Sequence, residues 1–448
     1  MKKHTQSPYE SSEISYKPSG IKWLGEIPQS WKNVSIRSCF TESNQRCNTD
    51  SYPLLSVTIA NGIIYQDDIE NKKDISNDDK SNYKIVPLNA VAYNKMRMWQ
   101  GAVGVNTLTI GIVSPAYIVA IPNEKILPNF VSYLFKSKIM ISEFDKNSYG
   151  LCLDMNNLRY DDFRNIKIPL PPLQEQKEIA EFLDEKCEKI QNYIDKKQKL
   201  ITLLQEKKQA LINEAVCGRV ACHTERSEVS TTAYKPSGIE YLGLIPHHWE
   251  VKKLKYVGKV VLGKMLCNEH QKGYSHCYYL KSKNLQWLNV EVSQIEKMWF
   301  SEYEKSLYRI KKDDLLVSEG GEVGKTCIWN NELAECYIQN SVHKITLNKF
   351  NNAKFFLYLF FTYGKLGVFD SVVSRVSIAH LVLEKLVNVD MVVPPLQEQK
   401  QIANFLDKKC EKINSAIEKT KRQITLIKEY KNTLINEAVC GRINLERK

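Results

Sequence analysis

Several short phrases carry residue types that could support catalysis, and the most suggestive one resembles a phosphate-binding loop. "EGGEVGKT" (319–326) follows the apolar run "LLVS" and contains a glycine-lysine pair. A phosphate-binding loop requires a glycine five residues before that pair, and Glu319 occupies this position. The equivalent phrase in the first half, "GAVGVN" from Gly101, has no lysine. We therefore expect a tight turn that presents Lys325, and a stand-alone NTPase that depends on Lys325 is kept as an alternative.

Two other catalytic patterns are incomplete. A methyltransferase acting on exocyclic amines needs an Asn- or Asp-led Pro-Pro-aromatic motif, whereas "LPPLQ" and "VPPLQ" have apolar leads and leucine in the aromatic place. The Asp313 and Asp314 pair lacks the downstream E-x-K of a metal nuclease, because two residues separate Glu322 from Lys325. Neither reaction is expected of this chain.

Histidine and cysteine do not form a recognisable site. The twelve cysteines include no C-x-x-C pair, and the nearest approach to zinc-ligand spacing is Cys217 and Cys222 followed by His223. We expect reduced, structural thiols and no bound metal. The other histidines considered, which lack a nucleophile at readable spacing, are His247, His248 and His343. The first two are expected in a surface turn, and the chain is expected to perform no catalysis.

The elements that would position any site are written twice in the sequence. "PPLQEQKEIAEFLDEKCEKI" (171–190) matches "PPLQEQKQIANFLDKKCEKI" (394–413) at 17 of 20 positions. "LINEAVCGR" recurs unchanged from Leu211 and from Leu434, and "YKPSGIKWLGEIPQSW" from Tyr16 returns as "YKPSGIEYLGLIPHHW" from Tyr234. A unit of this length, about 220 residues, is too long for a solenoid repeat. The order predicts a tandem duplication of a domain followed by a helix.

The two blocks between these phrases diverge but keep a common plan. Each has a strand-like run leading into a glycine loop, "AVAYNKMRMWQGAVG" (90–104) and "DLLVSEGGEVG" (314–324), and each later has an aromatic amphipathic segment, "NFVSYLF" (129–135) and "KFFLYLF" (354–360). Strand-rich alternation with a few helices indicates α+β domains of about 150 residues. The frame of the chain is repeated and the inserts vary.

The segments after each "PPLQEQ" are predicted to be long helices. Pro172 suits a first turn, Glu175 suits the positive end of the helix dipole, and Gly218 and Gly441 are stop signals. Apolar positions recur in steps of four and three, with polar interruptions at the same two places, which is the a/d pattern of a coiled coil. The positions in the first helix are Leu183, Cys187, Ile190, Ile194, Lys197, Ile201, Leu204, Lys208, Leu211 and Ala215. Those in the second are Leu406, Cys410, Ile413, Ile417, Thr420, Ile424, Ile427, Lys431, Leu434 and Ala438.

Two equal seams in one chain can bury each other. A pseudo-two-fold axis across the helices would make them an antiparallel coiled coil with one variable domain at each end. The alternative is an amphipathic helix that lies on its own domain. About 44 residues at about 1.5 Å each span about 65 Å, which is longer than such a domain would cover, and this favours the coiled coil.

The repeats divide the chain into seven expected segments. These are a leader (1–15), a first domain (16–172), a first helix (173–217), a polar linker (218–233), a second domain (234–395), a second helix (396–440) and a tail (441–448). The linker has no evident role beyond connection.

The net charge favours a polyanionic partner, and the hydropathy predicts no membrane segment. The net charge is +12, and a lysine or arginine against a phosphate releases condensed counterions. The start of the chain lacks the apolar stretch of a secretory leader. The longest apolar run, "FFLYLFF" from Phe355, is too short to cross a bilayer. We expect a soluble, cytoplasmic protein with no membrane partner.

These duplicated phrases, each following a variable domain that opens with "YKPSGI", resemble the specificity subunit of a Type I restriction–modification system. The phrases "YNKMRMWQGAVG" and "GIVSPAYIV" of the first variable domain also resemble target-recognition domains of that family. The resemblance covers nearly the whole chain, and the ordered double occurrence of the phrases is what makes it specific.

The resemblance implies a non-catalytic DNA-recognition subunit. Two target-recognition domains would each bind one half of a split site in double-stranded DNA, and the coiled coil would set the gap. Two modification (methyltransferase) subunits would methylate adenine with S-adenosylmethionine. Restriction (motor–nuclease) subunits would use ATP and Mg²⁺. No cofactor is expected on this chain.

Candidate contacts follow from polar residues on glycine-flanked loops, because base edges in the grooves carry the sequence information. The candidate DNA-binding residues are Asn94, Lys95, Arg97, Gln100, Ser318, Lys325, Gln339, Asn340, His343 and Arg375. Each has a solvated or structural role as its alternative, and Trp99 and Trp329 are expected in the core. The candidate coiled-coil and subunit-interface residues are Leu183, Ile190, Ile194, Ile201, Leu204, Leu211, Leu406, Ile413, Ile417, Ile424, Ile427 and Leu434. The rival from another class is a coiled-coil adaptor that holds two peptide-binding domains.

Overall fold

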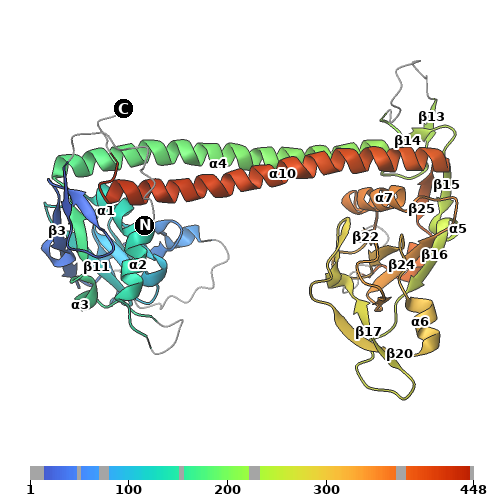
Figure 1. Cartoon of the computed structure of the whole chain (residues 1–448), viewed down its shortest axis with the longest axis horizontal. Helices are drawn as coiled ribbons and strands as arrows, with labels where there is room; N and C mark the ends of the chain where they lie inside the picture. The colour runs from blue at the N-terminus through green and yellow to red at the C-terminus, as the bar shows by residue number, and fades with distance from the viewer. Residues whose placement is uncertain are drawn as a thin grey trace, which may run out of the picture. The chain divides into compact units, whose positions relative to one another are not determined.

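The computed structural model describes residues 15–47, 52–69, 80–150, 156–220, 233–369 and 380–443. The chain divides into two compact units, residues 1–198 with 421–448 and residues 199–420. Each of the two long helices, α4 (Leu173–Val216) and α10 (Leu396–Val439), begins in one unit and ends in the other (Figure 1). The compact units therefore differ from the linear segments expected from the repeats, because each one includes parts of both long helices.

The first unit combines short antiparallel strands with short helices. Its strands are β1 (Tyr16–Pro18), β2 (Glu26–Pro28), β3 (Lys32–Ser35), β4 (Phe40–Ser43), β5 (Leu55–Thr58), β6 (Gly62–Tyr65), β7 (Lys84–Val86), β8 (Val91–Asn94), β9 (Val103–Val105), β10 (Gly111–Val113), β11 (Tyr117–Pro122) and β12 (Lys167–Leu170). Its short helices are η1 (Ile36–Ser38), η2 (Gln66–Asp68), η3 (Met98–Gln100), α1 (Pro128–Lys136), α2 (Lys138–Lys146) and α3 (Tyr160–Phe163).

The second unit has a similar mixture. Its strands are β13 (Tyr234–Pro236), β14 (Leu244–Pro246), β15 (Glu250–Lys253), β16 (Gly258–Leu262), β17 (Ser275–Leu280), β18 (Leu285–Gln286), β19 (Asn289–Val290), β20 (Glu296–Phe300), β21 (Leu315–Ser318), β22 (Thr326–Ile328), β23 (Tyr337–Ile338), β24 (Val342–Leu347) and β25 (Asp390–Val393). Its short helices are α5 (Leu254–Val257), η4 (Ser282–Asn284), α6 (Glu302–Tyr308), α7 (Ala353–Lys365) and α9 (Leu383–Leu386). Two domains that mix sheets and helices, each leading into a long helix, agree with the predicted architecture.

Each of the two domains contains a four-stranded antiparallel sheet with the same topology. Its order is β4-β11-β8-β9 in the first domain and β16-β24-β21-β22 in the second. In both domains the aromatic helix, α1 or α7, follows the second strand of that order. The glycine loops at 94–102 and 319–325 join corresponding strands, so the common plan inferred from the diverged blocks is confirmed.

Each domain closes by pairing its last strand with an early one. β12 pairs antiparallel with β3, and β25 pairs antiparallel with β15. The prolines of "PPLQEQ" follow at once, and the long helix begins at the next residue. Proline has no N–H to donate to a ladder, so the phrase ends the sheet pairing and starts the helix.

The two long helices bury the face that the apolar spacing predicts. Both contain 44 residues, and each ends one residue before the expected limit. All ten predicted seam positions of each helix are buried or half-buried, and the polar interruption Thr420 is only 5% exposed. Gly218 and Gly441, which follow the helices, have φ angles of +71° and +73°. This left-handed backbone is the usual helix stop and favours glycine.

The buried face contacts the domain and the other long helix together. In the first unit, Ile179 and Leu183 of α4 belong to one apolar cluster with Ala438 of α10 and with the core of the domain. In the second unit, Ile212 of α4 clusters with Leu406 of α10 in the same way. Within each unit, then, the beginning of one long helix packs against the end of the other.

The second glutamine of "PPLQEQ" fixes the start of each helix to its domain. Gln176 is fully buried, its Oε1 accepts from the N–H of Leu127 at 2.8 Å, and its Nε2 donates to the carbonyl of Pro171 at 2.9 Å. Gln399 is also fully buried and makes the corresponding bonds to Asn352 N at 2.7 Å and Pro394 O at 2.8 Å. A buried amide with both ends bonded specifies one geometry.

The glutamate of the same phrase binds the tryptophan of the opening phrase. Trp31 Nε1 donates to Glu175 Oε2 at 2.6 Å, and Trp249 Nε1 donates to Glu398 Oε2 at 2.9 Å. The aromatic helices add a third repeated contact, in which Tyr133 donates to Asp184 at 2.6 Å and its counterpart in α7 makes the same bond. These repeated side chains therefore make the same contacts between the domain and the start of its long helix in each unit, and we call this set of contacts the joint.

The opening phrase also contacts the "CGR" that follows the other long helix. Tyr16 Oη donates to the carbonyl of Gly441 at 3.2 Å, and Tyr234 Oη donates to that of Gly218 at 3.0 Å. A Cβ added at Gly441 would lie 2.5 Å from a proline ring atom of β2, and one added at Gly218 would lie 2.5 Å from the equivalent proline of β14. The three duplicated phrases thus meet at one joint per unit.

Candidate nucleic-acid interface

The loop between β8 and β9 presents most of the polar residues predicted for the first domain. The Asn94 side chain accepts from the N–H of Met96 at 3.0 Å, which turns the chain out of the strand. Arg97 and Gln100 are exposed, and Lys95 is half-buried. Trp99 is half-buried, and its Nε1 donates to the carbonyl of Met96 within the loop at 3.1 Å. It therefore packs against the loop and does not lie in the core, where it was expected.

Two further cations lie beside this loop that sequence reasoning missed. Burial lowers the pKa of the Lys84 ammonium, and the positive charges of Lys95 and Arg46 lower it further against the opposing effect of Glu42. Arg46 and Lys84 face each other in an isolated antiparallel bridge, and Lys84 Nζ lies 3.9 Å from Glu42 Oε1. Arg46 lies far from Lys84 in sequence, so only the pairing of strands brings them together. Of these cations Arg46 and Arg97 are exposed, whereas the Lys84 side chain is 12% exposed and lies against Glu42.

Lys136 of α1 supports this loop from inside the domain. Its Nζ donates to the carbonyls of Thr58 at 3.2 Å, Ile59 at 2.8 Å and Gly101 at 3.0 Å. Among the described residues no carboxylate pairs with Lys136, and burial lowers the pKa of its ammonium to about 8. Lys136 therefore links the β5–β6 turn to the end of the candidate loop through carbonyl groups.

This link has a pH signature. The folded pKa of about 8 lies below the ordinary value of 10.5, so between these values the unfolded chain binds more protons and the free energy of unfolding rises with pH. The advantage of wild type over Lys136→Met should therefore increase from pH 7.5 to pH 10. Paired thermal denaturation at the two pH values measures it, with exposed Lys138→Met as the control. A constant or shrinking advantage would contradict this assignment.

The β21–β22 loop is not a phosphate site. The loop "EGGEVGKT" connects two antiparallel strands, whereas a phosphate-binding loop leads from a strand into a helix N-terminus. Lys325 Nζ pairs with Glu322 at 3.1 Å, and its side chain is 17% exposed. The predicted tight turn is confirmed, but it holds Lys325 against a carboxylate instead of presenting it freely. The NTPase alternative loses its structural basis.

Two of the candidate contacts in the second domain are buried and must be corrected. Ser318 is 2% exposed and donates to the carbonyl of Gly320 at 2.7 Å. His343 is fully buried, its Nε2 lies 2.6 Å from the carbonyl of Leu381, and burial lowers the pKa of its imidazole. Both sit on strands covered on both faces. Neither side chain reaches the surface, so we assign them to the internal structure of the domain.

The remaining candidates in the second domain have mixed positions. Gln339 and Asn340 are half-buried in a turn beside the β21–β22 loop, to which Glu319 N connects by a bond to Ser341 O at 2.9 Å. Gln339 Oε1 accepts from the N–H of Ser341 at 3.1 Å. The structure thus brings this turn and the glycine loop together. Arg375 lies outside the described residues.

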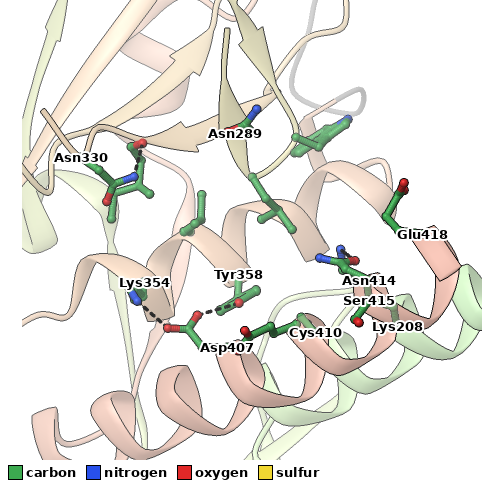
Figure 2. A pocket seen from close by; sticks show the side chains of 15 residues that line it. Lys208, Asn289, Asn330, Lys354, Tyr358, Asp407, Cys410, Asn414, Ser415 and Glu418 are labelled. Atoms are coloured by element: carbon green, nitrogen blue, oxygen red, sulfur yellow. Dashed lines mark hydrogen bonds and ion pairs between the residues drawn. The ribbon is translucent and has the colours of Figure 1, made fainter. Parts of the chain in front are cut away.

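A cavity of about 680 Å³ lies in the second unit between α7, α10 and the β18–β19 turn (Figure 2). Asp407 points toward Lys354 and Tyr358, and it accepts from Tyr358 Oη at 2.8 Å. Burial raises the pKa of the Cys410 thiol, so this thiol is not an activated nucleophile. Asp407 thus joins α10 to Lys354 and Tyr358 of α7, and Lys208 of α4 donates to Asn414 of α10 at 2.9 Å.

The other chemistry-bearing residues have structural surroundings. Asp314 is 2% exposed, and burial raises its pKa while Thr346 Oγ1 donates to it at 2.5 Å. His247 and His248 lie in an exposed turn, as predicted. Within the described ranges, no cysteine forms a disulfide and no group of three His, Cys, Asp or Glu side chains could hold a metal. Cys222 and His223 lie outside those ranges. Trp329 is core, as expected, at 1% exposed.

No helix in the described part of the chain is both long enough and apolar enough to cross a bilayer.

The family model described as "Type I restriction modification DNA specificity domain" matches residues 28–204 and 246–426. Each match begins near the end of an opening phrase and extends through the domain into the following helix. The duplication is therefore also a duplication of a known domain.

Curated relatives carry similar descriptions. The putative type I restriction enzyme MjaX specificity subunit of Methanocaldococcus jannaschii is 24% identical over 94% of this chain and 96% of its own length. The EcoKI specificity subunit of Escherichia coli K12 is 28% identical over 27% of this chain and 25% of its own length.

Solved structures share the fold. A chain from a study of complex assembly and conformational transition of the type I R-M system has a TM-score of 0.68 at 15% identity, covering 93% of this chain and 99% of that one. The HsdS subunit from Thermoanaerobacter tengcongensis has a TM-score of 0.53 at 17% identity, covering 93% and 98%.

Proposed function

Because the chain belongs to the type I restriction–modification DNA specificity family, we propose that it is the DNA-recognition subunit of such a complex. Each domain binds one half of a bipartite site in double-stranded DNA. Modification subunits bound to the long helices methylate adenine in each half with S-adenosylmethionine, and restriction subunits use ATP and Mg²⁺. The chain itself performs no catalysis and acts in the cytoplasm.

One observation carries this proposal. The two domains share the same sheet order, but apart from their glycines the corresponding loops differ in sequence, as "NKMRMWQG" (94–101) and "EGGEVGK" (319–325) show. The joint residues, in contrast, are the same in both halves. A constant scaffold with variable loops suits two recognition domains that bind different DNA sequences but attach to the long helices in the same way.

The long helices set the gap between the half-sites in this proposal. Within each unit, the beginning of one helix packs against the end of the other, which supports an antiparallel coiled coil with pseudo-two-fold symmetry. A helix of 44 residues spans about 66 Å, which is close to two turns of B-DNA at about 34 Å each.

Exposed leucines at equivalent positions mark where modification subunits dock. Leu203 of α4 is 51% exposed, and Leu426 of α10, its counterpart in the repeat, is 54% exposed. They lie in "ITLLQEKK" and "ITLIKEYK", outside the seam. Leu200 is also 39% exposed one turn before Leu203, and Tyr430 is 53% exposed one turn after Leu426, so each helix exposes an apolar patch there, which is typical of an interface.

Replacing each of these leucines by glutamate should weaken binding of modification subunits about tenfold or more, because a new charge would be buried in the interface. Co-purification and titration of the isolated subunit measure this effect. Gln205→Glu adds the same charge on another face of α4 and should bind as wild type does. Equal binding by all three variants would remove these leucines from the docking surface.

Methylome sequencing of a host that expresses this chain with its modification subunits tests the function. We expect adenine methylation in a motif of two short segments separated by a fixed gap. The adaptor alternative, in which the domains bind peptides, expects no methylated motif and no strongly salt-dependent affinity for DNA. An active complex that leaves no motif would refute the proposal.

A further inference from the structure

The second domain exposes an aromatic and cationic face on the β17–β20 ribbon. In this antiparallel pair, His276 lies opposite Trp299, and Tyr278 lies opposite Lys297. Alternate residues of a strand point to opposite faces, and the intervening residues, such as Tyr279 and Met298, are buried. His276, Tyr278 and Lys297 are exposed and Trp299 is half-buried, so these four side chains form one outward surface.

The side chains of this surface are organised by contacts with one another. The His276 ring stacks on the Trp299 ring at 4.7 Å between centroids, and the His270 ring meets the same indole edge-on at 4.6 Å. The Lys297 ammonium lies 4.4 Å from the centroid of the Tyr278 ring. Such packing reduces the side-chain entropy that binding would otherwise cost. The surface is therefore ordered, with ring N–H, hydroxyl and ammonium groups available at its outer edge.

No carboxylate lies on this outward face of the ribbon. Glu296, the nearest acidic residue of β20, alternates to the other face, where it accepts from Tyr279 Oη at 2.9 Å. It also binds Lys281 Nζ at 2.6 Å and Lys283 Nζ at 3.1 Å. The hydrogen bonds from Lys281, Tyr279 and Lys283 lower the pKa of its carboxyl to about 2. The negative charge is thus neutralised on the far side, and the outward face remains cationic.

The ribbon has dimensions and surroundings that suit duplex DNA. β23 pairs with β17 only at Tyr279 and Leu280, so the part of β17 that carries His276 and Tyr278 pairs with β20 alone. Neighbouring strands lie about 4.8 Å apart, and the major groove, about 12 Å wide, admits a two-stranded ribbon. Within the second unit, β17 and β20 lie at the end of the domain away from α7 and α10 (Figure 1). The helices can therefore hold protein partners while this end contacts a nucleic acid.

We propose that the outward face of the β17–β20 ribbon, formed by His270, His276, Tyr278, Lys297 and Trp299, enters the major groove of the half-site bound by the second domain. Lys297 contacts a phosphate or a guanine edge, and His276 and Tyr278 contact base edges, supported by Trp299. This assignment rests on the proposed function. It moves base reading in this domain from the buried Ser318 and His343 to the ribbon.

The test uses the full chain in complex with its modification subunits. The probes are a labelled duplex carrying the methylated motif and two duplexes in which one half-site is scrambled. The double variant Tyr278→Ala/Lys297→Ala should bind the motif duplex at least about tenfold more weakly. The slope of the logarithm of the binding constant against the logarithm of the salt concentration should fall by about one, which corresponds to one lost phosphate contact. Discrimination against the scrambled second half-site should be lost, and discrimination at the first should remain.

Lys349 and Phe350 provide a matched control. The Lys349 ammonium lies 5.2 Å from the exposed Phe350 ring, so Lys349→Ala/Phe350→Ala removes the same charge and a similar ring elsewhere in the domain. This control should bind as wild type does. His276→Ala, which leaves the charge of Lys297 in place, should lose second-half discrimination with little change in salt dependence. Circular dichroism and thermal denaturation check that each variant is folded.

The other outcomes separate the two proposals. A ribbon variant that binds the motif duplex with wild-type affinity and discrimination overturns the ribbon assignment and leaves the proposed function intact. A variant that loses modification subunits but keeps its DNA discrimination shows a protein contact and also overturns the assignment. If the wild-type complex does not prefer the motif duplex over either scrambled duplex, the proposed function fails, and the ribbon assignment fails with it.

Discussion

Replacing Trp249 by alanine is expected to lower the free energy of unfolding of the second unit by about 3–5 kcal/mol. The indole is 1% exposed and packs edge-on against Phe355 at 6.3 Å between ring centroids. A Cβ on Gly218 would lie 3.0 Å from the same indole, so the ring also fills the space beside the end of α4. Truncation would remove this packing and leave Glu398 with His248 as its remaining side-chain partner at 2.7 Å.

Hydrogen exchange under native conditions measures this effect within one unit. For amides of β25 and of the first turns of α10, the free energy of opening obtained from exchange rates should be about 3–5 kcal/mol lower than in wild type. Tyr303→Ala is the control, because this ring is 76% exposed in the same unit and its loss should cost within about 0.5 kcal/mol. Equal protection in the two variants would show that Trp249 is not part of the joint.

Ile417→Asp is expected to destabilise the second unit by about 3–5 kcal/mol and to separate α4 from α10 there. Ile417 is 6% exposed in the predicted seam, and placing an ionised carboxylate at this buried position costs desolvation energy in addition to the lost apolar packing. Ile194, also 6% exposed, has the same role in the first unit, so Ile194→Asp should act there. Assembly that requires both units should be lost in the double variant.

A pH titration distinguishes this mechanism from a general loss of structure. Burial raises the pKa of a carboxyl, so acidification should protonate the introduced aspartate and restore part of the protection of α4. Ser415→Asp adds the same charge at an exposed position of α10 and should remain close to wild type. A variant at Ile417 that assembles normally at neutral pH would show that the seam does not hold the two helices together.

Local pattern was sufficient for much of the architecture. The four-and-three spacing identified the buried face of both long helices, since an a/d repeat places one residue after another on one side of a helix. The glycine loops identified corresponding strands in the two blocks that diverge between the repeated phrases. The stop signals at Gly218 and Gly441 also held, because a left-handed residue after a helix favours glycine.

The candidate contacts depended on information that the sequence lacks. His343 lies on β24, a strand between β16 and β21 that is covered on both faces, and alternation alone does not show which face of a strand is covered. Arg46 is paired with Lys84 by a bridge between segments far apart in the sequence, which local pattern cannot show. The β17–β20 ribbon was missed for the same reason, because its cross-strand pairs exist only once the register is known.

The most direct test of the central claim is methylome sequencing with a variant chain that carries two identical recognition domains. In this variant, residues 30–170 replace residues 248–393, so both joints and both long helices are kept. If each domain reads one half-site, the complex should methylate a split motif made of two inverted copies of the first half-site, with the wild-type gap. Methylation of the wild-type motif, or of one uninterrupted sequence, would contradict the assignment of one half-site to each domain.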